Sequence, residues 1–373
     1  MKKPQLLAFM NAYSQGKSGG DMVFIEVVKR MHEYEKTIVT SKLGRKLCLD
    51  YGITGNFIIT SNEEKFINVT LTYIKRTIKA LLLFSKLQNY SLLLGTSDFL
   101  PDVLPLFLIS GKNKQSKWIQ HIFHVIPQNR HIVHAQQKIS FVLIKSRADL
   151  IIVDNALLKR ELLQLGFHKK RIIVNHPGIN LSFLSKVTSS KRNHYDALFM
   201  AQLRKQKGIF DLIKIWALVV KEIPNATLGI IGKGDSQITE ELKINIATLN
   251  LEKNITLLGF LDDQTAYETI KASKLFIFPS HEEGFGIAPL EAQALEVPVV
   301  AWDLPVFSKI FPKGMIRIPI GKLEQFASKV IHLLSNSQDR NKLAQSASKN
   351  ASQYDWNKTA QRELRAINTL QTT

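Results

Sequence analysis

The sequence predicts an α/β protein built from two doubly wound, Rossmann-like parallel-sheet domains that face a central cleft. Three observations predict this fold class. Short apolar runs alternate with amphipathic helical patterns along most of the 373 residues, as in successive β–α–β units. A chain of this length exceeds one ordinary hydrophobic core. The alternation lapses over residues 176–194, where Ser, Lys and Asn dominate the second half, and then begins again.

The predicted elements follow this alternation in order. The N-terminal strands are expected at 6–11, 37–40, 57–60, 91–94, 118–124, 150–153 and 172–175. The C-terminal strands are expected at 197–201, 227–231, 255–258, 275–278, 297–302 and 316–318. Helices are expected at 21–34, 155–165, 209–222, 237–249, 264–272 and 289–295. The domains are therefore predicted to cover residues 1–178 and 179–356.

Composition limits the class of protein. Hydrophobic residues make up 45% and charged residues 22%, which is typical of a folded globular chain. A single cysteine, Cys48, excludes an internal disulfide framework and fits a reducing compartment. No apolar run approaches the roughly 20 residues of a membrane-spanning helix. The net charge of +19 would attract nucleic acid, anionic lipid or phosphorylated substrates.

The segment PSHEEGFGIAPLEAQALEVPVVAW, residues 279–302, carries the clearest functional pattern. A strand is expected to end before it, and a glycine-containing loop leads to Pro289, which suits a first helical position. The free N–H groups of such a helix start would form an anion site. Glu283 and Glu291 frame this site, where sugar hydroxyl groups are the expected partners of a carboxylate. Alternatively, Glu291 only complements the helix dipole and Glu283 is solvated.

This segment resembles the E-x7-E signature of retaining GT-B glycosyltransferases, especially glycosyltransferase family 4. The resemblance implies that Glu291 binds the nucleotide ribose and that Glu283, a catalytic candidate, contacts the transferred sugar. It also implies that the sugar and the diphosphate pack against the backbone of Gly284, Phe285 and Gly286. The family usually has glycine where Glu296 stands, in a turn that is expected to face away from the cleft.

A second segment, ALFMAQLRKQKGIFDLIKIW at residues 197–216, resembles the family's G-R-L-x3-K-G stretch. There, Arg and Lys neutralise the donor diphosphate. Lys207 and Gly208 match the pattern, whereas Gln202 replaces the usual arginine and cannot supply a cationic contact. Arg204 or Lys205 is the candidate substitute. The alternative for Lys207 is an ordinary surface lysine.

Further donor-site candidates match the family by position. Gly19 and Gly20 follow the first strand, where the family keeps a Gly-Gly loop near the diphosphate. Asp263 lies where some guanosine-nucleotide users of the family contact the guanine edge. Asp262 and Asp263 also suit a helix N-cap, which is the preferred interpretation.

The N-terminal domain is expected to bind the acceptor. His124, at the end of the strand predicted at 118–124, is the second catalytic candidate. His121 is instead expected to be a hydrogen-bonded strand histidine. The segment SQYDWNKTAQRELRAI resembles the family's terminal W-x3-A helix, so residues 357–373 are expected to pack back on the N-terminal domain.

The resemblance implies retaining transfer of a sugar from a nucleotide-diphosphate sugar to an acceptor hydroxyl, without an essential metal or other cofactor. No Asp-x-Asp pair is placed to carry Mg²⁺ between phosphates. The expected partners are the donor and a glycan or lipid-linked acceptor, and not nucleic acid. Three alternatives stay open: a nucleotide-sugar epimerase of the same fold, a basic nucleic-acid-binding protein, and a scaffold that has lost activity.

The expected location is the cytoplasm, with peripheral attachment to the cytoplasmic face of an anionic membrane. The net charge favours this, and so does the stretch 66–87 in the acceptor domain. Its apolar residues are Tyr73, Ile74, Ile78, Leu81, Leu82 and Phe84. Its basic residues are Lys75, Arg76, Lys79 and Lys86. The alternative is a core helix with a solvated basic edge.

Overall fold

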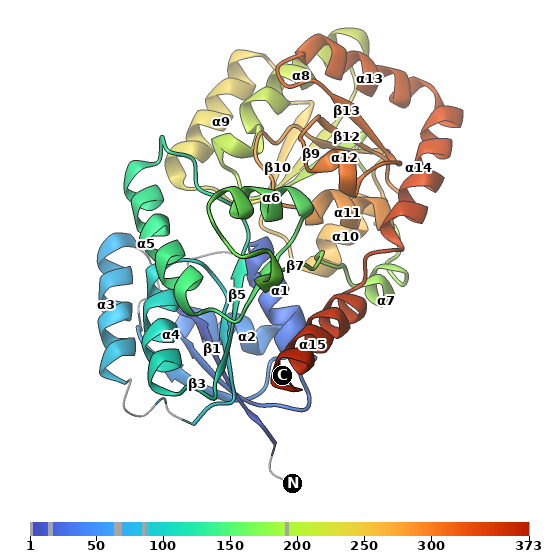
Figure 1. Cartoon of the computed structure of the whole chain (residues 1–373). Helices are drawn as coiled ribbons and strands as arrows, with labels where there is room; N and C mark the ends of the chain where they lie inside the picture. Colours follow the sequence, from blue (N-terminus) through green and yellow to red (C-terminus); the bar gives the residue numbers. More distant parts are fainter. Residues whose placement is uncertain are drawn as a thin grey trace. The chain divides into compact units, whose positions relative to one another are not determined.

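The computed structural model describes residues 3–13, 18–62, 69–83, 87, 89–190 and 194–372. The chain divides into two compact units (Figure 1). Unit 1 contains Met1–Gly178 and Trp356–Thr373, and unit 2 contains Ile179–Asp355. Both units are α/β, and each has a parallel sheet of its own.

Unit 1 is built on a seven-stranded sheet with the order β3-β2-β1-β4-β5-β6-β7. Its strands are β1 (Gln5–Met10), β2 (Glu35–Thr40), β3 (Asn56–Ile59), β4 (Leu92–Gly95), β5 (Lys117–Ile122), β6 (Leu150–Val153) and β7 (Ile172–Val174). All pairings are parallel, and Leu7 of β1 lies between Thr37 and Leu93. The strand order reverses between β1 and β4, which is the position where doubly wound sheets bind ligands.

Helices cover this sheet because its strands are apolar on both faces. They are α1 (Gly19–Val28), α2 (Lys42–Asp50), α3 (Val69–Leu82), α4 (Leu100–Lys112), α5 (His131–Arg147) and α6 (Ala156–Gln164). Helices α3, α4 and α5 lie side by side in one layer (Figure 1). Leu7, Phe9 and Trp118 are fully buried in the core.

The C-terminal helix α15 (Trp356–Thr372) packs on unit 1 and contacts α1 and β5. Its Glu363 is fully buried, and one carboxylate oxygen lies 2.9 Å from Nε2 of His121 on β5. Asn175 donates to the other oxygen at 3.3 Å. Thr359 also donates to the His176 carbonyl at 2.8 Å. Buried polar bonds therefore fix the last helix to this sheet, and His121 is a hydrogen-bonded strand residue.

Unit 2 has a six-stranded parallel sheet with the order β10-β9-β8-β11-β12-β13. Its strands are β8 (Ala197–Met200), β9 (Leu228–Ile231), β10 (Ile255–Gly259), β11 (Leu275–Phe278), β12 (Val299–Trp302) and β13 (Met315–Ile318). Its helices are α7 (Leu181–Leu184), α8 (Ile209–Glu222), α9 (Ser236–Thr248), α10 (Asp263–Lys271), α11 (Ile287–Ala294), α12 (Phe307–Ile310), α13 (Leu323–Ser335) and α14 (Ser337–Ala351). The order reverses between β8 and β11.

These sheets confirm the predicted fold class and every predicted strand, with shifts at some element ends. Helix α1 ends at Val28 instead of residue 34, because the following N–H groups close tighter three-residue turns. Strand β5 ends at Ile122, the last residue paired with β6, so His124 lies beyond the strand. Within the described ranges, no helix has the length and apolar character needed to cross a bilayer.

Glu296 adopts a positive φ of 65° in the exposed turn that joins α11 to β12. A residue with a Cβ is disfavoured in this left-handed region by roughly 1 kcal/mol. Glu296→Gly is therefore expected to stabilise unit 2 by about 1 kcal/mol and to raise its Tm by about 2–4 °C. Thermal unfolding measures this change. Glu252→Gly, at an exposed position without a positive φ, is the control and should not stabilise; a lower Tm for Glu296→Gly would contradict the prediction.

Candidate functional site

The candidate site of unit 2 lies where β8 and β11 end side by side. Residues 201–208 follow β8 and residues 279–286 follow β11. Because successive connections leave these two strands toward opposite faces of the sheet, their carboxyl ends border a crevice. This reversal brings together two segments that are some 75 residues apart in sequence, as in the contact of Lys207 with Glu282.

Backbone contacts hold these two loops together. The His281 N–H donates to the Gln206 carbonyl at 2.9 Å. Gly208 has a φ of 69°, and a Cβ at this position would lie only 1.7 Å from the Pro279 carbonyl oxygen. Only glycine allows both the left-handed backbone and this close approach. The two loops therefore form one fixed platform.

Lys207 and Glu283 meet on this platform. The Lys207 Nζ lies 2.6 Å from Glu283 Oε1, and the two side chains are 27% and 11% exposed. The Lys207 ammonium also donates to the Glu282 carbonyl at 3.4 Å. Because the pair is partly buried, solvent and salt screen it less than they would a surface pair. The two residues singled out in separate motifs thus share one site.

Helix α11 begins beside this ion pair, but not at Pro289. Gly286 is its N-cap, with a φ of 100°, and a Cβ there would lie 2.9 Å from the Phe307 ring. Pro289 is the third helical residue, which still needs no N–H donor. The Leu290 N–H donates to the Gly286 carbonyl at 3.2 Å, so it is not part of the predicted anion site. The helix-start donors are those that precede Pro289.

Glu291 lies in the second turn of α11, not in the first turn as predicted. The helix dipole acts mainly within the first turn, so complementing it explains Glu291 poorly. The hydroxyl group of Tyr267 on α10 donates to Glu291 Oε1 at 2.6 Å. Sequence reasoning missed Tyr267. The available signal was helical spacing, because Tyr267 follows the candidate Asp263 by four residues and shares its helix face.

The remaining donor-site candidates of unit 2 differ in their placement. Gln202 is half-buried directly after β8, whereas Arg204 is exposed. Lys205 lies 3.3 Å from Glu241 on α9 and is directed to that helix. Arg204 therefore stays the candidate substitute for the missing arginine charge.

The aspartates at the start of α10 have distinct positions. Asp262 is the N-cap and accepts from the Thr265 N–H at 3.0 Å, and this bond lowers its pKa. Asp263 is the first helical residue. The preferred capping interpretation therefore holds for Asp262, and Asp263 follows the edge strand β10.

Phe285 is oriented inward. Its side chain is 4% exposed and contacts the Tyr354 ring edge-on, with centroids 5.6 Å apart. Gly284 and Gly286 flank it on the platform. A ligand in this place would meet backbone rather than the Phe285 ring, as the resemblance implies.

In unit 1, Gly19 and Gly20 are the first two residues of α1 and not part of a loop, which corrects the prediction. Ser18 and Asp21 form a capping box that sets this helix start. A Cβ on Gly20 would lie 2.9 Å from the Phe123 ring, so glycine lets α1 approach the segment that carries His124.

His124 is half-buried two residues after β5, and Gln137 of α5 holds its backbone. Gln137 Nε2 donates to the His124 carbonyl at 2.9 Å, and its Oε1 accepts from the Ile126 N–H at 2.8 Å. The same amide also bonds Asp98. Burial raises the pKa of Asp98, and the neighbouring His124 partly offsets the rise. Sequence reasoning missed Asp98 and Gln137, which carry no motif.

Across the described parts of the chain, no group of three or more His, Cys, Asp or Glu side chains is placed to hold a metal ion. His281 of the platform forms a pair with Asp211, in which His281 Nε2 lies 2.8 Å from Asp211 Oδ2. Metal independence of the reaction stays a prediction.

The two doubly wound sheets and the platform at the strand reversal of unit 2 define a protein of GT-B architecture. Residues 182–350 match the family described as Glycosyl transferases group 1. The structure superposes on Anabaena HepE, solved in complex with UDP and glucose, with a TM-score of 0.83. That likeness covers 98% of this chain and 100% of the other at 17% identity, so it shows the fold.

Two curated relatives match parts of the chain. One is the poly(glycerol-phosphate) alpha-glucosyltransferase of Bacillus subtilis, 30% identical over 164 residues, which are 43% of this chain and 24% of the relative. The other is a phosphatidyl-myo-inositol mannosyltransferase of Mycobacterium leprae, 27% identical over 202 residues, 52% of this chain and 53% of the relative. The chain thus spans about a quarter and about half of these relatives.

Proposed function

We propose that the chain is a retaining glycosyltransferase that moves a sugar from a nucleotide-diphosphate sugar to an acceptor hydroxyl. The observation that carries the proposal is the convergence of Lys207, Glu283 and the start of α11 at one strand reversal. A cation and helix N–H groups suit a diphosphate, and a carboxylate suits sugar hydroxyl groups. The match of residues 182–350 to a family of glycosyl transferases supports the same activity. The complex of HepE with UDP and glucose favours a UDP-sugar as donor.

Each residue of the platform has a proposed role in donor binding. Lys207 neutralises the diphosphate together with Arg204 and the N–H groups that precede Pro289. Glu291 accepts the ribose hydroxyl groups, and Tyr267 orients its carboxylate through the 2.6 Å hydrogen bond. Gly284, Phe285 and Gly286 offer backbone to the sugar, and Glu283 binds its hydroxyl groups. Asp263, one helical turn before Tyr267, is the candidate contact to the base.

The proposed chemistry is electrostatic and needs no metal. The bond between the anomeric carbon and the phosphate oxygen breaks while Lys207 and the helix start stabilise the departing diphosphate. The acceptor oxygen then bonds the anomeric carbon from the same face, and its proton passes to the departing phosphate oxygen. His124 in unit 1, held by Gln137, is the proposed residue for acceptor use. Gly19 and Gly20 are proposed to lie near the diphosphate.

The acceptor is proposed to be a glycan or a lipid-linked molecule, bound by unit 1 on the cytoplasmic face of a membrane. The net charge of +19 supports peripheral attachment to an anionic surface. One named relative acts on phosphatidyl-myo-inositol, according to its name, which agrees with such a location.

The alternative functions predict different experimental results. An epimerase of the same fold would convert the nucleotide sugar without an acceptor, and a scaffold would neither bind nor consume it. A nucleic-acid-binding protein would retain RNA or DNA in a filter-binding assay at physiological salt. Gln202, in place of arginine, is the feature that keeps the inactive scaffold under consideration.

A thermal-shift screen with UDP-, GDP- and ADP-sugars tests donor binding directly. A donor that binds only the folded protein, present at a concentration of 100 times its Kd, stabilises the folded state by about 2.7 kcal/mol. Glu291→Ala is expected to weaken donor affinity about 10- to 30-fold, because it removes a charged hydrogen-bond partner worth roughly 1.5–2 kcal/mol. Glu268→Ala, a half-buried glutamate on the same helix as Tyr267, is the control. Wild-type donor affinity in Glu291→Ala would reject its assignment to the ribose.

A further inference from the structure

Helix α3 presents an apolar stripe outward. Its members Leu71, Ile74, Ile78 and Leu82 are 57%, 50%, 51% and 76% exposed. An amphipathic helix normally turns such a stripe toward the core. On α3 this stripe faces solvent, while Ala80 on the same helix belongs to the core and Leu83 packs against it. Phe66, Phe84 and Lys86 lie outside the described residues. Arg76, predicted as surface charge, is instead fully buried.

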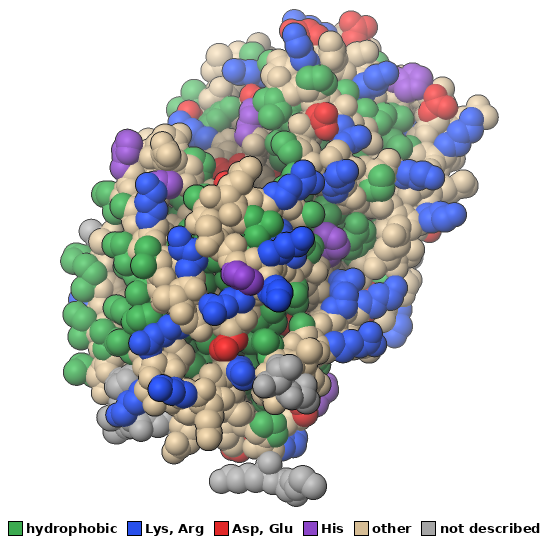
Figure 2. Space-filling model, in the orientation of Figure 1, with side chains coloured by type: hydrophobic (Ala, Val, Ile, Leu, Met, Phe, Trp, Pro, Cys, Tyr) green, Lys and Arg blue, Asp and Glu red, His purple; other side chains and the backbone are tan. Residues whose placement is uncertain are grey.

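The apolar surface continues over the neighbouring helices of the same layer. On α5, Ile132 is 77%, Ile139 is 54% and Val142 is 61% exposed, and Leu108 on the intervening α4 is 38% exposed. Figure 2 shows hydrophobic side chains gathered at the left edge of the molecule, over these helices, among Lys and Arg side chains. We call this surface the α3–α5 face. Contiguous exposed apolar surface of this kind marks an interaction site.

The charge of the α3–α5 face has one sign. Helices α3 and α5 contain no Asp or Glu, and Asp102, the one acidic residue of α4, is fully buried. The exposed basic residues are Lys75 and Lys79 on α3, Lys112 on α4, and Lys138, Lys145 and Arg147 on α5. Among the described residues, neither Lys75 nor Lys79 forms an ion pair. An apolar surface with only positive charge is complementary to an anionic bilayer.

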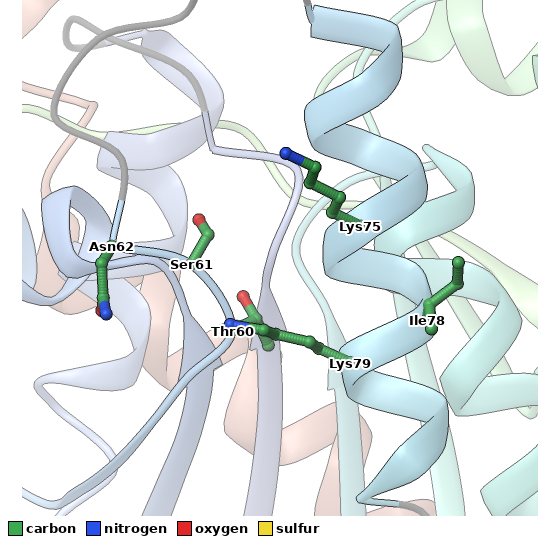
Figure 3. Close-up of a pocket in the computed structure, with 6 residues that line it drawn as sticks. All are labelled: Thr60, Ser61, Asn62, Lys75, Ile78 and Lys79. Atoms are coloured by element: carbon green, nitrogen blue, oxygen red, sulfur yellow. The ribbon is translucent and has the colours of Figure 1, made fainter.

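A pocket of about 510 Å³ opens beside this face, between α3 and the segment that follows β3. It is lined by Thr60, Ser61, Asn62, Lys75, Ile78 and Lys79. In Figure 3 the Lys79 side chain extends from α3 toward Thr60, and Lys75 extends to the same side of the helix. Ser61 is buried, and its Oγ accepts a hydrogen bond from the Arg76 Nε at 2.8 Å. Its own O–H is therefore left to donate to an anion in the pocket.

We propose that the α3–α5 face binds an anionic phospholipid bilayer and that this pocket holds the phosphate group of one lipid. The ammonium groups of Lys75 and Lys79 and the Ser61 hydroxyl bind phosphate oxygens, while the apolar stripe of α3 enters the acyl boundary. The inference rests on the membrane attachment proposed above and specifies its surface and ligand. It does not depend on the sugar-transfer chemistry of unit 2.

Vesicle flotation tests the proposal with the full chain. We expect binding to phosphatidylglycerol–phosphatidylcholine vesicles at low salt, and little binding to pure phosphatidylcholine. Lys75→Gln with Lys79→Gln should weaken this binding about 10- to 30-fold, since each lysine near the bilayer contributes about 1 kcal/mol. Lys329→Gln with Lys349→Gln removes the same charge from exposed positions on α13 and α14, and should change binding by no more than about twofold.

Two further experiments distinguish a specific lipid-headgroup site from diffuse electrostatic attraction to the bilayer. Ile78→Ser with Leu82→Ser should weaken flotation while keeping its salt dependence. Glycerol 1-phosphate should compete with vesicles for the wild type and have less effect on the Lys75/Lys79 variant. Equal losses in the two lysine pairs, or no flotation at low salt, would overturn the proposal. If the protein binds glycerol 1-phosphate tightly but does not bind vesicles, the ligand of the pocket is a free phosphate compound. This outcome would also reject the membrane proposal.

The donor-induced thermal shift is measured for every variant. It should match that of the wild type, because the substitutions lie in unit 1 and leave the unit 2 platform intact. Failure of flotation with a normal donor shift therefore rejects only the membrane site. Failure of the donor shift in the wild type would reject the proposed function and leave the lipid result standing.

Discussion

Replacing Lys207 with alanine is expected to lower kcat/KM of sugar transfer roughly 100-fold. The substitution removes the cation that lies 2.6 Å from Glu283 at the strand reversal of unit 2. Loss of a charge-assisted contact to the diphosphate should weaken donor binding by about 1.5–3 kcal/mol. The extra loss in kcat is expected because negative charge on the diphosphate grows as the glycosidic bond breaks. Steady-state kinetics with a donor found in the thermal-shift screen measures both quantities.

Two companion variants make this result specific. Lys205→Ala removes a lysine two positions away that pairs with Glu241, and it should leave kcat/KM within about twofold. Gln202→Arg restores the residue usual at this position, and it should be tolerated or tighten donor binding. Sugar transfer at the wild-type rate in Lys207→Ala would reject the assignment of the donor diphosphate to this site. Severe loss in Gln202→Arg would show that Gln202 itself is required.

Replacing Glu363 with alanine is expected to destabilise unit 1 by about 3–5 kcal/mol. The variant leaves His121, which is 1% exposed, without its carboxylate partner in a site that water does not reach. Asn175 loses its bond to the same side chain. Because the pair fixes α15 to β5, helix docking and sheet stability should fall together. The Tm of unit 1 is expected to drop by roughly 10 °C.

Thermal unfolding with and without donor checks the assignment of this loss to unit 1. Lys358→Ala, at an exposed position on the same helix, controls for altered helix propensity and should change Tm by less than about 2 °C. Donor binding by unit 2 should persist in Glu363→Ala below the first unfolding transition. An unchanged Tm in Glu363→Ala would mean that the buried pair contributes nothing to the docking of α15.

Much of the candidate site was predictable because its motifs are local. The strand–loop–helix pattern placed Gly284 and Gly286 between a strand end and a helix start, where the structure has them. Helix boundaries were less predictable: Pro289 suits several first-turn positions, and the positive φ of Gly286 moved the helix start two residues earlier. Because of that shift, Glu291 lies in the second turn, beyond the main reach of the helix dipole. Its carboxylate is instead hydrogen-bonded by the Tyr267 hydroxyl group.

The sequence by itself determined the two parallel sheets, since buried strands alternate with helices in a fixed period, and it identified Lys207 and Glu283 as separate motif residues. Tertiary structure decided that these two side chains meet, because the reversal between β8 and β11 joins segments distant in the chain. It also decided the environment of α3. A helical pattern fixes which residues share a stripe, but only the packing of neighbouring elements determines whether that stripe faces core or solvent. For Ile74, Ile78 and Leu82 it faces solvent.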